Sequence, residues 1–458
     1  MNRFMLPMQL TCLTLAVCTQ LYAQDNVLTN SASQTSGVEA QQKETTQLAP
    51  IVVTATRSAK SIADIAGTVY SIDQAEIEKQ ANAGKSIADI LGTLVPSLTP
   101  SSGTTSNYGM TMRGRVVQYM IDGVPQTGYR DGSRQLNSIQ PSMIERIEVV
   151  SGATSIYGSG ATGGIINIIT KRGGQDPISF ETKIKSDAMA YEASQSVLFN
   201  QGALQGAFGA SYTTRGEIQD SHGNRIGPEV AQTDRQDTDT LDLNGRLTWN
   251  ISDEQSLSFG AQYYNDEQDS EYGPDYGPNL AYVKRDPTYT ASLAAVKGMQ
   301  LETQPQTERY AFNTQYENQN VLGHTLNAEA YYRNEQARWF PSAQAMGGGL
   351  YLVYQSETDI DVYGARVALQ KQFDLNGRNL GLSYGIDYEN EQDEQNIQMY
   401  DSAAFVASNG LNYKPFNYYA FGPDVETEKL GTFVQTDFDV TDRLGLKAGV
   451  RYERVESQ

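Results

Sequence analysis

Long segments in which apolar and polar residues alternate fill the second half of the chain and constrain its fold more than any other feature. One segment places on a single face Leu241, Leu243, Gly245, Leu247 and Trp249. A period of two puts alternate side chains on one face of a β-strand. The pattern recurs about eleven times between residues 178 and 458, which predicts one large antiparallel sheet.

The connections between these segments alternate in length, which favours a membrane barrel over a water-soluble sandwich. They are short at residues 252–253, 320–323 and 376–379, and long at residues 269–305 and 396–427. Outer-membrane barrels combine short periplasmic turns, long outer loops and aromatic residues near the strand ends. The sequence therefore predicts membrane-spanning strands.

The expected number of strands is odd, whereas a bacterial single-chain barrel has an even number. Residues 451–458 also lie in mid-strand. At this spacing, a barrel of about 22 strands, the size of plugged transporters, needs about twice as many residues. We therefore expect residues 176–458 to form the N-terminal half of such a barrel. A non-functional truncated product is an alternative, because an open sheet edge in lipid leaves backbone groups unsatisfied.

Residues 1–23 have the features of a secretory signal peptide: Arg3, a short apolar run, and Ala23 at the expected cleavage site. A lipoprotein signal ending at Cys18 is the alternative. Both cysteines lie within this segment, so the remaining chain is expected to lack disulfides and thiolate metal sites. Residues 24–48 are polar and are expected to form a flexible periplasmic tail.

A short apolar run at residues 51–55 stands alone after this tail. It fits either the first strand of a domain or a strand that docks onto a partner by strand addition. The next region mixes helical and extended patterns, which predict a small α+β domain rich in glycine. The expected helices cover residues 73–80 and 85–91, and the expected strands cover residues 115–121, 144–150 and 165–170.

Composition and missing motifs exclude several functions. Lys+Arg total 34 against Asp+Glu 54, so the net charge of −20 excludes nucleic acid as the default partner. His222 and His324 are the only histidines and form no zinc motif, so we expect no catalytic residues, no metal site and no enzyme activity. The glycine pattern at residues 158–163 precedes a strand rather than a helix, which argues against nucleotide binding. Acids in the long loops leave a calcium site open.

Arginine and aromatic residues in this acidic chain predict an anion pocket with aromatic walls. Its candidate residues are Tyr108, Tyr129, Arg130 and Arg134, with Trp339 and Tyr351 from an outer strand end and loop. Arg113 and Arg115 flank a predicted strand, where structural ion pairing is the competing interpretation.

Several motifs, taken in order, resemble those of TonB-dependent outer-membrane receptors. They are IDGVP at residues 121–125, IERIEV at 144–149, YG at 157–158 and GGIINIITK at 163–171. The resemblance covers residues 50–458. It implies a plug domain at residues 58–175 followed by a transmembrane antiparallel β-barrel, of which residues 176–458 supply about the first 11 of an expected 22 strands.

The same resemblance implies a binding segment for the energy-transducing protein TonB at residues 49–57. This TonB box consists of Ile51, Val52, Val53, Thr54 and Ala55. It also implies structural contacts between plug and barrel through Arg113, Arg115 and Arg146. Since some facing carboxylates of the family lie in later strands, Arg113 and Arg146 are expected to be buried without partners if those strands are absent.

Residues 107–115, 133–138, 151–158 and 331–335 are similar to the aerobactin-type branch of the family. This similarity adds Asn107 to the expected ligand-binding residues. It implies a monomeric barrel in outer-membrane lipid that imports a ferric citrate-hydroxamate siderophore into the periplasm and needs no cofactor. The alternatives are another ferric hydroxamate, cobalamin or haem as the ligand, or a secreted β-rich binding module without a transport role.

Overall fold

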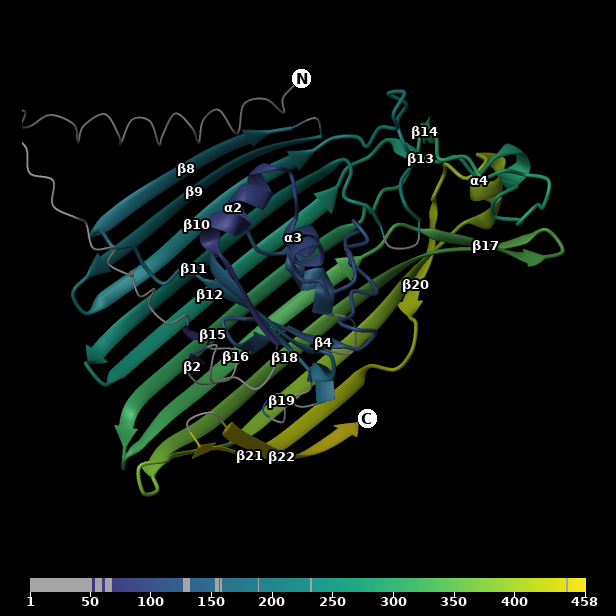
Figure 1. The fold of residues 1–458 in the computed structure, drawn as a ribbon. Coiled ribbons are helices and arrows are strands. Elements are labelled where there is room, and N and C mark those ends of the chain that lie inside the picture. The colour runs from purple at the N-terminus through teal and green to yellow at the C-terminus, as the bar shows by residue number, and fades with distance from the viewer. Residues whose placement is uncertain are drawn as a thin grey trace, which may run out of the picture. The chain divides into compact units, whose positions relative to one another are not determined.

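The computed structural model describes the positions of residues 52–53, 60–61, 68–126, 132–152, 156, 159–187, 189–230, 233–441 and 444–458. Residues 50–458 belong to one compact unit. This unit contains a small mixed domain, here called the plug, and a large antiparallel sheet (Figure 1). The expected fold class is confirmed in the plug and in the strands that follow it.

The plug contains a five-stranded sheet with the order β3-β6-β7-β4-β5. Strands β4 and β7 run parallel, and the other neighbours run antiparallel. The strands are β3 (Thr68–Asp73), β4 (Val117–Ile121), β5 (Val124–Pro125), β6 (Ile144–Ser151) and β7 (Gly164–Thr170). In the described residues of the plug, three short 3-10 helices accompany them: η2 (Gly132–Asn137), η3 (Pro141–Met143) and η4 (Ser159–Ala161).

Two α-helices of the plug begin at polar caps. Helix α2 (Gln74–Asn82) starts after Asp73, whose carboxylate accepts a hydrogen bond from the Glu76 N–H at 2.9 Å. Helix α3 (Ile87–Leu94) starts after Ser86, which forms a capping box with Asp89. Both predicted helices are confirmed, but they start one or two residues later because a cap precedes its helix. The plug core between the helices and the sheet includes Ile77, Ile87, Ile90, Leu91, Tyr119, Ile147 and Ile166.

The large sheet has thirteen strands, and eleven of them form one continuous path from β8 to β22. The path contains β8 (Ile178–Ser186), β9 (Ala190–Gln201), β10 (Leu204–Arg215), β11 (Thr238–Ser252), β12 (Gln255–Gln268), β15 (Gln306–Val321), β16 (His324–Arg338), β18 (Leu350–Asp374), β19 (Asn379–Tyr400), β21 (Val425–Thr441) and β22 (Leu444–Ser457). Among the described residues, β8 and β22 end the path without pairing to each other.

The two faces of this sheet have the polarity expected for a barrel wall. On β11, Asp242 and Arg246 are buried, whereas Leu243 and Trp249 are exposed. On β8, the exposed positions include Ile184, which is 74% exposed. The buried face is thus polar and the exposed face is apolar, which is the inverse of a water-soluble domain and matches strands that face lipid.

From β9 onward, connections are short at one end of the strands and long at the other, as predicted, whereas β8 and β9 are joined by a short connection at the end that carries the long ones. The long connections carry additional elements: β13 (Tyr272–Pro274), η5 (Pro278–Leu280), β14 (Ala295–Lys297), β17 (Ser342–Gly347), α4 (Ser402–Ala407) and β20 (Pro415–Ala420). Residues of these loops form an apolar cluster of their own, which includes Tyr276, Phe340, Phe405 and Tyr413. No helix in the described part of the chain is both long and apolar enough for a transmembrane span.

Only part of the predicted TonB box is placed. Strand β1 (Val52–Val53) pairs with β2 (Lys60–Ser61) in an antiparallel register. Ile51, Thr54 and Ala55 lie outside the described residues. The role of residues 51–55 therefore stays a prediction.

Candidate functional site

The candidate site begins at a plug loop of residues 99–110, here called the apex loop. Asn107 is buried in it and adopts a left-handed conformation (φ 47°), which asparagine tolerates better than most residues. Its side-chain oxygen accepts a hydrogen bond from the Ser101 hydroxyl at 2.9 Å. The next residue, Tyr108, is 68% exposed. The loop is thus fixed internally and presents an aromatic ring to solvent.

Arg134 lies on η2 and makes the second part of the site. Its Nη1 atom is 2.9 Å from Oε1 of Glu335 on β16, and both side chains are buried. Its guanidinium carbon lies 4.7 Å from the centroid of the Trp339 ring, within cation–π range. Arg134 is predicted to line an anion pocket, and in the structure its guanidinium already has an anionic partner, Glu335 of the sheet.

Hydrogen bonds connect the apex loop to η2 and to two outer loops. The Asn137 side chain donates to the Thr105 carbonyl at 3.0 Å. The Thr105 N–H donates to the Thr233 carbonyl at 2.9 Å. The Thr233 hydroxyl accepts from the Phe340 N–H at 2.8 Å, and Phe340 follows Trp339. These contacts join Asn107, Tyr108, Arg134 and Trp339 into one group, which we call the apex site.

The remaining predicted ligand residues have different outcomes. Tyr351 packs against the apolar loop cluster that contains Phe340, so it is connected to the apex site only through that cluster. Tyr129 and Arg130 lie outside the described residues.

Four arginines of the sheet contact the plug, and sequence reasoning did not select them. Arg246 Nη1 lies 2.9 Å from Asp122 Oδ1. Arg309 donates to the Gln135 side chain at 2.6 Å and to the Ser138 hydroxyl at 2.9 Å. Arg366 and Arg451 donate to the backbone carbonyls of Gly123 and Ile156. A charged residue on the polar face of an alternating segment could have indicated such a contact. Arg246 is in this position in the segment of residues 241–250.

The expectation for the plug arginines needs correction. Arg113 is exposed rather than buried, and Arg115 is exposed as well. Arg146 pairs within the plug, with Glu145 and with Glu148 at 2.8 Å. Glu148 is fully buried and supplies the partner that was expected from a later strand. Among the described contacts, the sheet therefore contributes more of the cations that join it to the plug than the plug does.

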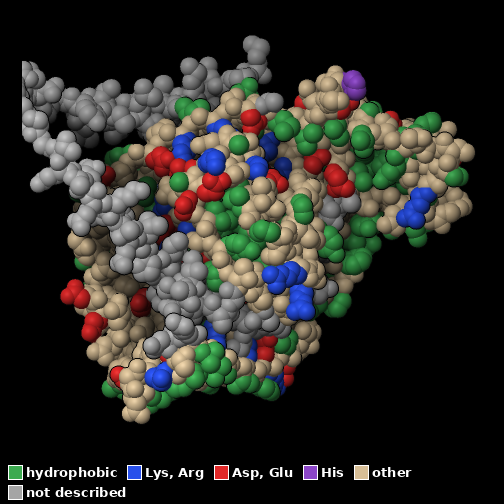
Figure 2. Space-filling view, in the orientation of Figure 1, with side chains coloured by type: hydrophobic (Ala, Val, Ile, Leu, Met, Phe, Trp, Pro, Cys, Tyr) green, Lys and Arg blue, Asp and Glu red, His purple; other side chains and the backbone are tan. Residues whose placement is uncertain are grey.

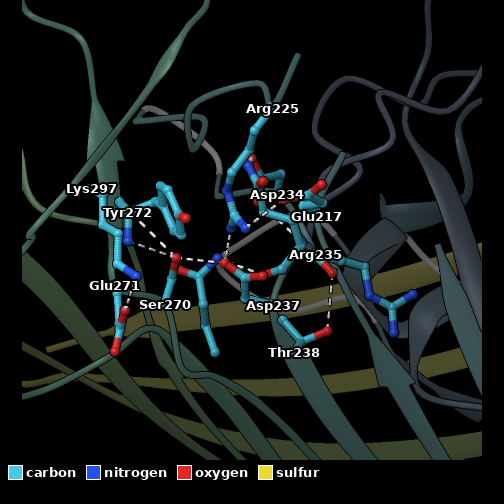
Figure 3. A network of polar contacts seen from close by, with 12 residues as sticks. Glu217, Arg225, Asp234, Arg235, Asp237, Thr238, Ser270, Glu271, Tyr272 and Lys297 are labelled. Carbon is cyan, nitrogen blue, oxygen red and sulfur yellow. Dashed lines mark hydrogen bonds and ion pairs between the residues drawn. The ribbon is translucent and has the colours of Figure 1, made fainter. Parts of the chain in front are cut away.

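A polar network fixes the loop that carries Thr233 (Figure 3). Arg225 pairs with Asp237 and lies 3.9 Å from the centroid of the Tyr272 ring. The Ser270 hydroxyl also donates to Asp237, at 2.5 Å. Burial raises the pKa of the nearby Asp234 carboxyl above its usual range, although that carboxyl accepts backbone hydrogen bonds. The loop between β10 and β11 is thus held against the loop that follows β12.

A cleft of about 530 Å³ lies beside the apex site, between helix α2 and strands β8 to β11. Figure 2 shows charged side chains of both signs gathered over this part of the molecule. Its lining includes Asn137 and Arg235, which also border a small cavity next to Arg134. Among the described residues, no group of three or more His, Cys, Asp or Glu is arranged to hold a metal ion.

Comparison with known protein families identifies two regions of the chain. Residues 61–165 match the TonB-dependent receptor plug domain, and residues 248–458 match the TonB-dependent receptor-like β-barrel.

Similar proteins include two named receptors. The rhizobactin receptor of Rhizobium meliloti is 33% identical over 91% of this chain and 57% of its own length. The ferric aerobactin receptor of Klebsiella pneumoniae is 34% identical over 89% of this chain and 56% of its own length. The chain thus spans little more than half the length of these relatives.

Solved structures share the fold at lower sequence identity. The ferripyoverdine receptor of the Pseudomonas aeruginosa outer membrane superposes with a TM-score of 0.65 at 17% identity, covering 91% of this chain and 55% of that one. The unliganded ferric citrate transporter FecA gives 0.63 at 16% identity, covering 86% and 57%. These solved structures share the fold, and the matches to the two family models, together with the two receptors at 33% and 34% identity, show that the chain belongs to the TonB-dependent receptor family.

Proposed function

We propose that this protein is an outer-membrane receptor that binds a ferric citrate-hydroxamate siderophore of the aerobactin type and imports it into the periplasm. The names of the two relatives, the rhizobactin receptor and the ferric aerobactin receptor, support this class of ligand. The exposed apolar face of the sheet supports a location in the outer membrane.

The observation that carries the proposal is the direct connection, at the apex site, between the plug and the outer loops. Thr105 of the apex loop and Phe340 of an outer loop both donate hydrogen bonds to Thr233. A ligand bound at the apex site therefore contacts outer loops and the domain that must rearrange to admit it. Binding can change the plug only if the ligand interacts differently with its two states, and contacts that span both parts supply such a difference.

The residues of the apex site fit an anionic chelate. Positive charge comes from the guanidinium groups of Arg134 and Arg309, which both act on the single carboxylate of Glu335. Trp339 and the exposed ring of Tyr108 supply flat apolar surfaces. Import requires binding and release rather than bond cleavage, so the proposed function needs no catalytic residue and no cofactor.

Release is proposed to depend on TonB, which binds at residues 51–55 by strand addition. The placed part of this segment, β1, is already extended and paired with β2. Pulling on it would act on β3 and then on helix α2, because these elements follow along the chain.

Competition binding tests the choice of ligand. The gene that carries this sequence is expressed in a Gram-negative strain that lacks its own siderophore receptors, and binding of iron-labelled ferric aerobactin is measured. We expect unlabelled ferric aerobactin to compete and cobalamin and haemin not to compete. Preferential competition by cobalamin or haemin would exclude the proposed ligand class.

Fractionation of the same cells tests the location. We expect the protein in the outer-membrane fraction, with a mobility in gels that shifts on boiling. Recovery as a soluble periplasmic or secreted protein would instead favour a β-rich binding module without a transport role.

A further inference from the structure

We propose that Thr233 is a positioning residue of the apex site, which holds the plug and the strand end that carries Trp339 at fixed places relative to each other. The role of the apex site in ligand binding rests on the proposed function. The positioning itself rests only on the contacts of Thr233.

Thr233 makes one hydrogen bond to each side of the site. Its carbonyl oxygen accepts from the Thr105 N–H of the plug at 2.9 Å. Its hydroxyl accepts from the Phe340 N–H at the end of β16 at 2.8 Å. Thr233 is 3% exposed and Phe340 is also buried, so water cannot readily replace these bonds. Thr233 therefore joins the plug to an outer loop through two buried interactions.

The backbone of Thr233 shows that this residue is held by its surroundings. Its φ is 59°, and it is the only β-branched residue with a positive φ in the part of the chain that the structure describes. A β-branched side chain is disfavoured in this conformation, whereas glycine or asparagine adopts it readily. Such a conformation persists only where neighbouring contacts determine it, and it often occurs at functional sites. A threonine here supplies a hydroxyl acceptor at a steric cost.

The residues after Thr233 provide the fixed support that such a conformation requires. The Gln268 side chain donates to the Gln236 carbonyl at 2.8 Å, and the Asp269 N–H donates to the Asp237 carbonyl at 2.8 Å. Asp237 also binds Arg225 and Ser270, as Figure 3 shows. Residues 236–237 are thus hydrogen-bonded to the end of β12, which holds the segment that carries Thr233 in place.

The two partners of Thr233 stand next to proposed ligand-binding residues. Phe340 follows Trp339, whose ring lies 4.7 Å from the Arg134 guanidinium carbon. Thr105 precedes Asn107 by two residues on the apex loop. Loss of the Thr233 hydroxyl removes the acceptor of the Phe340 N–H, so the backbone next to Trp339 is expected to become more mobile. The Thr233 carbonyl still accepts the hydrogen bond from the Thr105 N–H.

A matched pair of substitutions separates the hydroxyl from the shape of the side chain. Thr233→Val keeps the β-branched shape and removes the acceptor, whereas Thr233→Ser keeps the acceptor and removes the methyl group. Both are made in the whole detergent-solubilised protein with Trp249→Phe, because residues 1–458 contain two tryptophans and Trp249 lies on the exposed face of the sheet. Any tryptophan outside residues 1–458 is also replaced by phenylalanine. Acrylamide quenching of the remaining tryptophan then reports the accessibility of Trp339 without a ligand.

We expect Thr233→Val to increase the quenching constant of Trp339 by about two-fold or more, because an unsatisfied buried N–H favours local opening. Thr233→Ser should have the same quenching constant as the parent protein. If the valine variant does not accumulate, Thr233→Ala removes the same acceptor with less crowding and carries the same expectation. Equal quenching in all variants, or an equal increase in the serine variant, would overturn the proposal.

Ferric aerobactin binding to the same proteins extends the test to the ligand. We expect the dissociation constant to rise by about ten-fold for Thr233→Val and to stay within about two-fold for Thr233→Ser. A parent that binds no ferric aerobactin, but whose variants still differ in quenching, would contradict the proposed function and support the positioning role. A parent that binds, with variants equal in both measurements, would contradict the positioning role alone.

Discussion

Arg134 of the plug and Glu335 of strand β16 form a buried ion pair, with 2.9 Å between Nη1 and Oε1. The Gln135 side chain donates to the same carboxylate. Removing one partner of a buried pair leaves the other charge uncompensated, which costs more than the pair contributes. This contact therefore makes the attachment of the plug to the sheet sensitive to single substitutions.

Glu335→Gln is expected to lower the free energy of unfolding of the plug by about 3 kcal/mol, since the Arg134 charge would remain buried. The double variant Glu335→Gln with Arg134→Met should lose less than the sum of the two single variants. Urea unfolding of the purified protein, monitored by the protease accessibility of the plug, measures the free energy of unfolding of each single variant and of the double variant. Strictly additive losses would show that the two side chains do not interact.

Asp122 offers a second test of the plug contacts, because it has two functions at once. It pairs with Arg246 at 2.9 Å and adopts a left-handed conformation (φ 51°). Asp122→Asn removes the charge, but asparagine still adopts the left-handed conformation readily. Asp122→Ala removes the charge and also places in this conformation a residue that disfavours it. Left-handed backbone costs an ordinary residue about 1–2 kcal/mol, and alanine also loses the acceptor of the Thr170 N–H. Unfolding in urea should therefore show alanine to be less stable than asparagine by at least about that amount. Equal stabilities would exclude a contribution from the backbone.

The exposed apolar face of the sheet predicts that a charged side chain is costly at a lipid-facing position. Leu243→Arg, in the middle of β11, should reduce stability in a bilayer by about 2–4 kcal/mol, the cost of arginine at a membrane midplane. Leu243→Phe is the control and should fold as the parent does. The gel shift on boiling after refolding into lipid vesicles measures the folded fraction. Full folding of the arginine variant would contradict a lipid-facing position.

The outer loop cluster predicts a loss of stability in alkali. Burial raises the pKa of Tyr276 to about 12 from 10.0, although its hydroxyl lies 3.3 Å from that of Tyr413. Because the pKa is higher in the folded state, the stabilising contribution is complete below pH about 10 and is lost as the pH rises toward 12. Absorbance titration of tyrosinate should show delayed ionisation, and Tyr276→Phe should remove one delayed step. An unchanged titration would contradict burial of this hydroxyl.

Local patterns in the sequence predicted most of the sheet and the plug. The alternation on β11 identified a strand, because a helix does not keep every second side chain on one face. The helical patterns predicted both helices to within two residues of their starts, which are fixed by the caps Asp73 and Ser86. Alternation alone, however, does not say which face is buried, and the inverted polarity became visible only with the plug contacts.

The contacts of the site were less predictable, because they join residues far apart in the chain. Arg309 contacts Gln135, and Thr105 contacts Thr233, through the packing of the whole unit. The long loops have no periodic pattern of apolar residues from which the packing of Tyr276 against Phe405 could be predicted. Aromatic and arginine content identified Arg134 and Trp339 as candidates, but not the ion pair with Glu335.

TonB-dependent uptake tests the central claim most directly. Accumulation of iron-labelled ferric aerobactin is measured in cells with and without TonB, and for Val53→Pro, which removes a backbone donor from the segment proposed to add a strand to TonB. We expect uptake only with TonB and the parent protein, while binding at the cell surface is unchanged in all three cases. Equal uptake without TonB, or binding without any uptake in the parent, would contradict the proposed transport.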